Sequence, residues 1–125
     1  MLSAANRLTD AQSYRTVIRS GRRAGSRTLV VHLVEHVEVS DPGMSTSPRV
    51  GLVVSKAVGN AVTRNRVQRR LRHLVREQLD RLPRTGALVI RALPDAAGAT
   101  SAELRTDLDR CLQRALPSTE PERAT

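Results

Sequence analysis

The sequence predicts an α+β fold, a small α-β sandwich with the element order α-β-β-α-β-α and a short mixed sheet. Three observations predict it. The chain has 125 residues, which suits one domain with one core. Three segments repeat apolar residues at helical spacing, and three others are short, apolar and rich in β-branched residues. Residues 50–92 run strand, helix, strand, which favours a parallel pair with a crossover helix.

The first helix should begin near Thr9, because Thr9 and Gln12 have the spacing of a capping box. Gly21 is a suitable C-cap. Between these ends, apolar residues recur at helical spacing: Ala11, Tyr14, Val17 and Ile18. Arg15, Arg19, Arg22 and Arg23 make this helix and its exit basic.

Two strands should follow and pair as a hairpin. Residues 28–39 are rich in β-branched residues, and one strand face would carry Leu29, Val31, Leu33, Val37 and Val39. Residues 40–49 are dense in Ser, Pro and Gly, which predicts a loop. The second strand of the hairpin would be residues 50–55.

The main helix is predicted over residues 61–82, with Asn60 as its N-cap and Pro83 as its stop. Its apolar stripe consists of Val67, Leu71, Leu74, Val75 and Leu79. Residues 86–92 are short and apolar, and predict a buried strand.

The last helix should open at a capping box of Thr100 and Glu103. One face of it carries Leu104, Leu108, Cys111, Leu112, Ala115 and Leu116. We therefore expect one domain over residues 1–116 and a disordered tail over 117–125. The core must be aliphatic, because the chain has one Tyr and no Phe or Trp.

The charge of the chain indicates a polyanionic partner, either nucleic acid or an acidic membrane surface. The formal net charge is +9, from 21 basic and 12 acidic residues. Residues 1–84 hold 16 basic and 6 acidic groups, whereas residues 85–125 hold 5 and 6. The partner should therefore meet the first two-thirds of the chain.

No apolar stretch approaches the ~20 residues of a membrane span, and the first residues have no signal-peptide pattern. A single cysteine, Cys111, excludes an internal disulfide and suits a reducing compartment. We expect a soluble, cytoplasmic protein with no membrane contact.

The most informative segment is residues 55–73, because residues 64–76 contain six arginines and no acid. At helical spacing Arg69, Arg72 and Arg76 share one side, opposite the apolar stripe. Arg66 and Arg70 form an adjoining pair. Like charges at this spacing repel, and a polyanion relieves the repulsion and releases counterions. Before them lie Lys56, Gly59 and Asn60, which together with the free N–H groups of the helix N-terminus make a plausible phosphate cradle.

These residues carry a family resemblance. The stretch V-G-L-V-V-S-K-A-V-G-N-A-V-T-R-N-R-V-Q-R-R-L-R-H resembles the signature of the bacterial ribonuclease P protein. Gly59-Asn60-Ala61-Val62 and Arg64-Asn65-Arg66 match its Gly-Asn-Ala-Val and Arg-Asn-Arg segments. The opening N-R-L-T-D-A-Q-S-Y-R-T-V-I-R-S-G-R-R is similar to the start of that family. The resemblance runs from about Arg7 to Leu116, nearly the whole chain.

The resemblance implies a function that composition alone does not. In this family a catalytic RNA subunit, ribonuclease P RNA, cleaves precursor tRNA in a Mg²⁺-dependent hydrolysis that removes the 5′ leader. The protein assists without catalytic residues of its own, and Mg²⁺ acts through the RNA. The basic helix and its leading loop bind the RNA subunit, and a cleft between the sheet and the first helix holds the single-stranded leader. The resemblance also implies a left-handed β-α-β crossover, against the usual rule. It implies no obligate protein partner.

The resemblance also implies which residues of this chain contact RNA. The RNA-facing set that the resemblance implies is Lys56, Asn60, Arg64, Asn65, Arg66, Arg69 and Arg72, and we add the neighbouring Gly59 and Arg70. In the leader cleft Tyr14 takes the first aromatic position, Ile18 the second and His32 the third. A base stacked on Tyr14 would contribute roughly 1–3 kcal/mol.

The sequence departs from the family at several of these positions. Ala57 and Gln68 stand where many members have lysine, and Arg70 partly compensates. Ile18 and His32 replace aromatics, so base stacking in the cleft should be weaker. Tyr14 and Ile18 fit a core stripe equally well, and His32 suits a half-exposed strand position.

Three other functions fit the sequence less well than that of a ribonuclease P protein. The first is a nuclease that acts without RNA. For that function the sequence offers no close carboxylate pair, no Ser/His/Asp order and no HExxH motif, and the one candidate base, His73, has no orienting partner. Three scattered histidines and one cysteine lack metal-ligand spacing. A ribosomal protein or other binder of structured RNA would share the composition but not the long signature. A DNA-binding module would need helix-turn-helix spacing or a dimer seam, and neither is evident.

Overall fold

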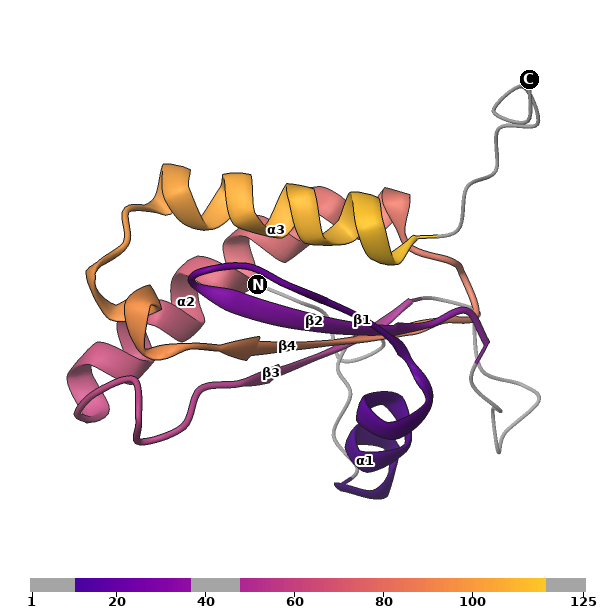
Figure 1. The fold of residues 1–125 in the computed structure, drawn as a ribbon, viewed down its shortest axis with the longest axis horizontal. Helices are drawn as coiled ribbons and strands as arrows, with labels where there is room; N and C mark the ends of the chain where they lie inside the picture. Colours follow the sequence, from indigo (N-terminus) through magenta and orange to yellow (C-terminus); the bar gives the residue numbers. More distant parts are fainter. Residues whose placement is uncertain (1–10, 37–47, 117–125) are drawn as a thin grey trace.

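The structure, a computed structural model, describes residues 11–36 and 48–116. Its helices and strands follow the predicted α+β class with one additional strand (Figure 1). In chain order they are α1 (Ala11–Ser20), β1 (Arg22–Gly25), β2 (Leu29–Val34), β3 (Arg49–Val53), α2 (Ala61–Gln78), η2 (Leu79–Arg81), β4 (Ala87–Ala92), η3 (Pro94–Gly98) and α3 (Ser101–Ala115). No helix among these residues is long and apolar enough to cross a membrane.

The sheet has the strand order β1-β2-β4-β3, so the predicted hairpin between residues 28–39 and 50–55 is wrong. Strand β4 lies between β2 and β3, antiparallel to β2 and parallel to β3. Strand β4 takes this interior place because its apolar residues are buried on both faces. Strand β2 instead forms its hairpin with β1, through a turn in which Ser26 Oγ accepts from the Leu29 N–H at 3.2 Å.

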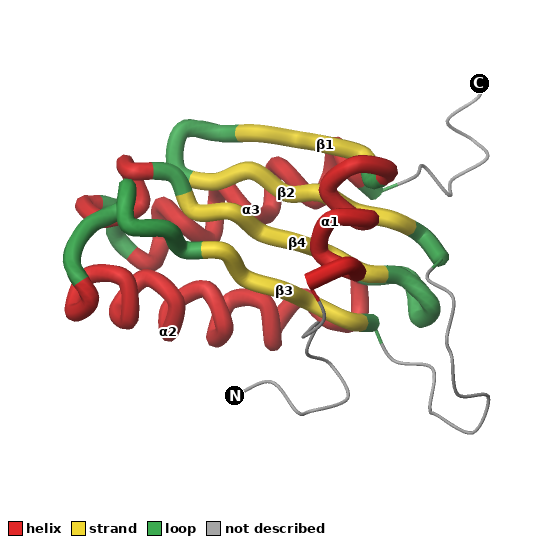
Figure 2. Tube along the Cα trace, turned by 90° about the horizontal axis from the view of Figure 1, so that it is seen from below, coloured by secondary structure: helices red, strands yellow, loops and turns green. Residues whose placement is uncertain are grey.

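Strand β1 was missed because its sequence, Arg-Arg-Ala-Gly, carries no apolar alternation. It forms because it lies at the edge of the sheet, where its two arginines remain exposed to water. The predicted parallel pair of β3 and β4 is confirmed. The path from β3 through α2 to β4 is left-handed, as Figure 2 shows, and so agrees with the expectation.

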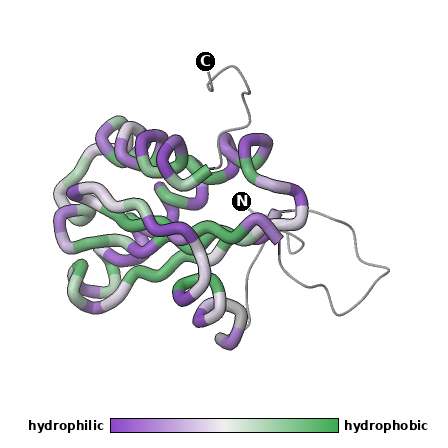
Figure 3. The backbone as a smooth tube through the Cα atoms, turned by 45° about the vertical axis from the view of Figure 1, so that its right-hand side comes forward, coloured by the Kyte–Doolittle hydropathy of each residue, from purple (hydrophilic) through white to green (hydrophobic). Residues whose placement is uncertain are grey.

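The helices cover the sheet unequally (Figure 2). Helices α2 and α3 lie together on one face and bury the larger core, which includes Leu29, Val31 and Leu33 of β2. Helix α1 lies on the other face, where Val17 packs on Ala87 and Val89 of β4. The hydrophobic strands therefore lie between helical layers (Figure 3). Strand β2 is buried on both faces, which explains why its sequence alternates imperfectly.

The predicted helix ends are largely confirmed. Asn60 Oδ1 accepts from the Thr63 N–H at 2.9 Å, and Thr100 with Glu103 forms the full capping box of α3. Helix α1 ends at Ser20, and the N–H of Gly21, the next residue, donates to the Val17 carbonyl at 2.8 Å. A Cβ on Gly21 would lie 2.5 Å from the same carbonyl oxygen, so the position requires glycine. Outside the described residues lie Thr9, Val37, Val39 and the predicted tail.

Candidate RNA-binding surfaces

The arginines of α2 divide into two groups by their contacts. Arg66 Nη2 donates to the Ala97 carbonyl at 3.0 Å, and Arg70 Nη1 donates to the Ala99 carbonyl at 2.9 Å. These two side chains fasten α2 to η3 and the turn that follows it. A guanidinium has five donors, so both retain donors for a second partner, but each has a structural role that the sequence did not reveal.

The other group comprises three arginines on the side of α2 opposite its buried stripe. Arg69 and Arg76 are exposed, Arg72 is half-buried, and none of the three forms an ion pair with a described residue. We call Arg69, Arg72 and Arg76 the arginine ridge. Their shared side was predicted from the spacing, and the buried stripe of Val67, Leu71, Leu74 and Val75 lies opposite.

Arg64 differs from its neighbours because it lies one heptad before the buried Leu71, on the side of the apolar stripe. It is half-buried, and its Nε atom is buried without a hydrogen-bond partner. Asn65 is exposed beside it. The Arg-Asn-Arg segment therefore presents one solvated amide between two arginines that also contact the protein.

The acidic groups lie mainly on the α3 side of the molecule. Glu77 binds Arg105 at 3.2 Å, and Asp109 binds Arg81 at 2.6 Å. Glu77 also lies 3.7 Å from His73, so the expectation that His73 lacks a partner is wrong. The His73 side chain is 70% exposed, so this pair lies at the surface of α2.

The N-terminus of α2 gathers the predicted cradle residues. Lys56 and Asn60 are exposed, and Gly59 adopts a φ of +156°, which L side chains rarely take. The first intrahelical bond runs from the Arg64 N–H to the Asn60 carbonyl, and the first turn has no acid. The N–H groups of residues 61 and 62 therefore have no partner within the helix. They lie at the positive end of the helix dipole, where an anion is favoured.

A second surface lies on the sheet face that α1 covers in part. The ring of Tyr14 lies against β3: a Cβ built on Gly51 would come within 2.4 Å of its Cε1 and Cζ atoms. Burial raises the pKa of Tyr14, and a hydrogen bond with the Leu52 backbone opposes that shift. Ile18 packs in the same small cluster. Tyr14 and Ile18 thus form part of a minor core, and each is half-buried.

His32 is more buried than predicted, with 3% of its surface exposed, so the half-exposed assignment is wrong. It is buried because β2 has a neighbour on each side and α1 packs over this face. Both ring nitrogens lack a hydrogen-bond partner. Burial lowers the pKa of His32, and the nearby cations Arg91 and Arg23 lower it further. Sequence reasoning missed Arg91 and did not link Arg23 to this site, because cross-strand neighbours depend on the register.

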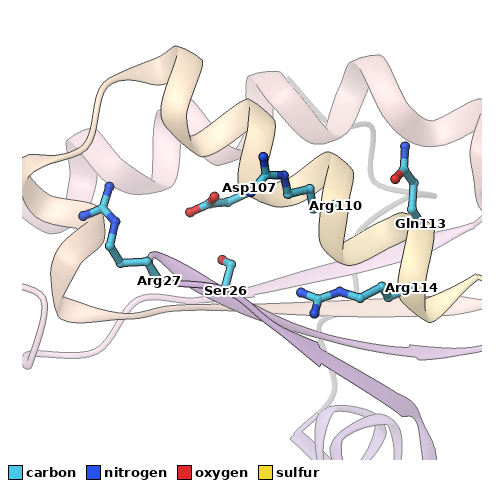
Figure 4. Close-up of a pocket in the computed structure, with 6 residues that line it drawn as sticks. All are labelled: Ser26, Arg27, Asp107, Arg110, Gln113 and Arg114. Carbon is cyan, nitrogen blue, oxygen red and sulfur yellow. The ribbon is translucent and has the colours of Figure 1, made fainter.

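The cavity between the β1–β2 turn and α3 is a less suitable site for a polyanion (Figure 4). It has a volume of about 540 Å³ and is lined by Ser26, Arg27, Asp107, Arg110, Gln113 and Arg114. Arg27 pairs there with Asp95 and Glu103, both at 3.8 Å, and Asp107 adds a further carboxylate. The local positive charge is therefore largely compensated, unlike that of the arginine ridge.

Comparison with known proteins decides the family. The profile described as Ribonuclease P matches residues 2–116. The ribonuclease P protein component of Nocardioides sp. is 60% identical over 114 residues, covering 91% of this chain and 94% of the relative. That of Streptomyces bikiniensis is 52% identical over 118 residues, covering 93% and 96%.

The chain belongs to the bacterial ribonuclease P protein family. As a ribonuclease P protein it is a component of the ribonuclease P holoenzyme, which implies tRNA processing and ribonuclease P RNA as its partner. The structure of the Staphylococcus aureus RNase P protein matches with a TM-score of 0.73 and 22% identity, covering 88% of this chain and 94% of that one. The Thermotoga maritima RNase P protein matches with a TM-score of 0.71 and 21% identity, covering 89% and 98%. At these identities the two structures support the fold alone.

Proposed function

We propose that this ribonuclease P protein binds the catalytic RNA through the arginine ridge and the N-terminus of α2. The observation that carries the proposal is the charge arrangement of α2. Three arginines on one side have no ion pair with a described residue, while the carboxylates of the helix layer pair on the α3 side. Each phosphate that such a surface neutralises releases counterions, which makes binding strong and dependent on salt.

We further propose that the single-stranded 5′ leader of precursor tRNA lies across the sheet face beside α1. Tyr14 lies over Gly51 of β3 on this face, and Ile18 packs in the same cluster. The buried His32 lies two strands away on β2, in register with Val89 of β4. Arg23 and Arg91, on the strands that flank His32, would meet the leader phosphates. A polyanion there would also offset the repulsion between these two cations.

We assign the cleavage step to the RNA subunit and propose that RNA holds the Mg²⁺. The hydrolysis would leave a 5′-phosphate on mature tRNA. The described residues contain no group of three or more His, Cys, Asp or Glu that could hold a metal ion. The protein's part is positioning and neutralisation of phosphate charge. We place this work in the cytoplasm, with no membrane contact and no obligate protein partner.

The first experiment measures cleavage of precursor tRNA at low Mg²⁺ with the RNA subunit of the same genome, with and without the protein. We expect protein alone to be inert and to restore cleavage when the RNA is present. Cleavage by protein alone would show an independent nuclease. No effect of the protein on its own RNA would refute the proposed function and favour a general binder of structured RNA.

The surface assignment is tested with variants of matched charge. Arg69→Ala should weaken binding to the RNA subunit and lower the slope of log Kd against log salt by about 0.7–0.9. Arg105→Ala removes the same charge from α3, where Glu77 already compensates it, and should change the slope much less. Equal effects of the two variants would contradict the ridge. For the leader, Tyr14→Ala should weaken binding of precursor tRNA and spare mature tRNA.

A further inference from the structure

Val62 is the one large hydrophobic side chain that the described residues leave exposed, with 74% of its surface accessible. It is the second residue of α2, directly after the Asn60 cap and Ala61. A single exposed apolar residue is common on protein surfaces and by itself needs no explanation. The position of Val62 makes it unusual.

Helix α3 shows what the same chain does at the corresponding place. Both helices begin with a side-chain cap on the third helical N–H, from Asn60 to Thr63 and from Thr100 to Glu103. In α3 the second residue is the exposed Ala102, and an acid follows at the third position. Both choices favour a helix N-terminus.

Helix α2 departs from both choices. Valine in an exposed helical position is less favourable than alanine because its β-branched side chain loses rotamer freedom. The first turn of α2 also lacks an acid. Both departures make the start of α2 less stable in the free protein. Both also favour a polyanionic partner that carries apolar groups, because no carboxylate repels its phosphates and an exposed apolar side chain can contact its apolar surface.

The surroundings of Val62 restrict what that contact can be. At helical spacing its neighbours toward the helix C-terminus are Asn65, Arg66 and Arg69, at i+3, i+4 and i+7. No acidic residue occurs from 42 to 76. A partner must therefore combine dense negative charge with a small apolar surface, and an unstacked nucleotide offers both through its phosphates and the face of its base.

We propose that Val62 packs against an unstacked nucleobase of the RNA held by the arginine ridge. This inference rests on the proposed function, in which that RNA is ribonuclease P RNA. The ridge supplies the salt-dependent part of the affinity, and Val62 supplies a contact that does not depend on salt. The apolar contact also fixes where along the RNA the ridge binds, because phosphates alone carry no sequence information.

The test compares Val62→Ala, Val62→Thr and Arg69→Ala in the full chain, each titrated with ribonuclease P RNA over a range of salt. We expect Val62→Ala to bind about three- to tenfold more weakly at every salt concentration, with an unchanged slope of log Kd against log salt. Val62→Thr keeps the branched shape and should also bind more weakly. Arg69→Ala should change the slope. Thermal unfolding of Val62→Ala should occur at the same or a higher temperature than that of the wild type.

Wild-type affinity in both Val62 variants would overturn the inference and leave the proposed function intact. A lower unfolding temperature for Val62→Ala would also overturn it, because the side chain would then stabilise the free protein. If Val62→Ala instead lost discrimination between precursor and mature tRNA in the holoenzyme, the base would belong to the leader, and the assignment to the RNA subunit would be wrong. Wild-type protein that fails to bind the RNA would refute the proposed function itself.

Discussion

Replacing Gly51 with alanine should displace the ring of Tyr14, the only tyrosine of the protein. In the structure the position of a Cβ on Gly51 lies 2.4 Å from Cε1 and Cζ of Tyr14 and 2.5 Å from its Oη. Ordinary contacts of a Cβ lie at 3.4–4 Å, so the ring must withdraw by about 1 Å or more. Because Tyr14 is half-exposed, it can move outward, but it then loses its contact with β3 and its hydrogen bond with the Leu52 backbone.

The size of the effect follows from two opposing terms. Overpacking of this kind destabilises by about 1–3 kcal/mol. Alanine in place of glycine also restricts the unfolded chain, which stabilises by about 0.4–1 kcal/mol. We expect Gly51→Ala to lower the free energy of unfolding by about 1.3 kcal/mol, the difference between the midpoints of these two ranges.

The chain offers an internal probe for this change. It has one Tyr and no Phe or Trp, so its tyrosine fluorescence and near-ultraviolet circular dichroism report on Tyr14 alone. In Gly51→Ala we expect a weaker near-ultraviolet signal and stronger quenching by acrylamide. Urea unfolding supplies the free energy, and binding of precursor relative to mature tRNA supplies the functional effect.

A double-mutant cycle decides whether the ring is the cause. In a Tyr14→Ala background the added methyl meets no ring, so Gly51→Ala should be neutral or slightly stabilising. If Gly51→Ala destabilises both backgrounds equally, the glycine serves the strand rather than Tyr14, and the reasoning is wrong.

Three further predictions concern other contacts. Because burial and the neighbouring cations lower the pKa of His32, its protonation favours the unfolded chain, and the stability it contributes is full above the ordinary pKa of 6.5 and is lost as the pH falls below that value. In urea unfolding, His32→Phe should remove the fall in the free energy of unfolding that His32 causes below pH 6.5. The same dependence of this free energy on pH in the variant and the wild type would contradict the prediction. Arg70→Ala should lower the free energy of unfolding by about 1 kcal/mol through loss of the bond to Ala99, whereas Arg69→Ala should change it by less than about 0.5 kcal/mol. Thr100→Ala should lower it by about 1 kcal/mol by removing the capping box, and Thr100→Ser should restore most of the loss.

The helices of this fold could be predicted because their signals are local. Caps at Asn60 and Thr100 and stripes at helical spacing mark α2 and α3 to within a few residues. The sheet could not be predicted equally well, because strand pairing depends on partners far apart in the chain. Ser, Pro and Gly between residues 40 and 49 suggested a hairpin, but the apolar strand β4 occupies the place beside β2.

The candidate site shows the same division. The spacing of α2 predicted that Arg69, Arg72 and Arg76 share a side. Spacing could not show that Arg66 and Arg70 bind backbone carbonyls of the η3 region, since those contacts cross about 30 residues of chain. Nor could it show that Gly51 accommodates the ring of Tyr14, because that contact needs both the strand register and the placement of α1.

The place of β4 between β2 and β3 sets an order for biosynthesis. Among residues 11–36 and 48–116, strand β3 pairs only with β4, and β2 pairs with β4 from Leu29↔Ala92 to Val34↔Ala87. The whole of α2 is therefore synthesised before β4, the strand that joins β3 to β2 and β1. The four-stranded sheet can therefore be completed only after Ala92, the last residue of β4, has been added to the chain.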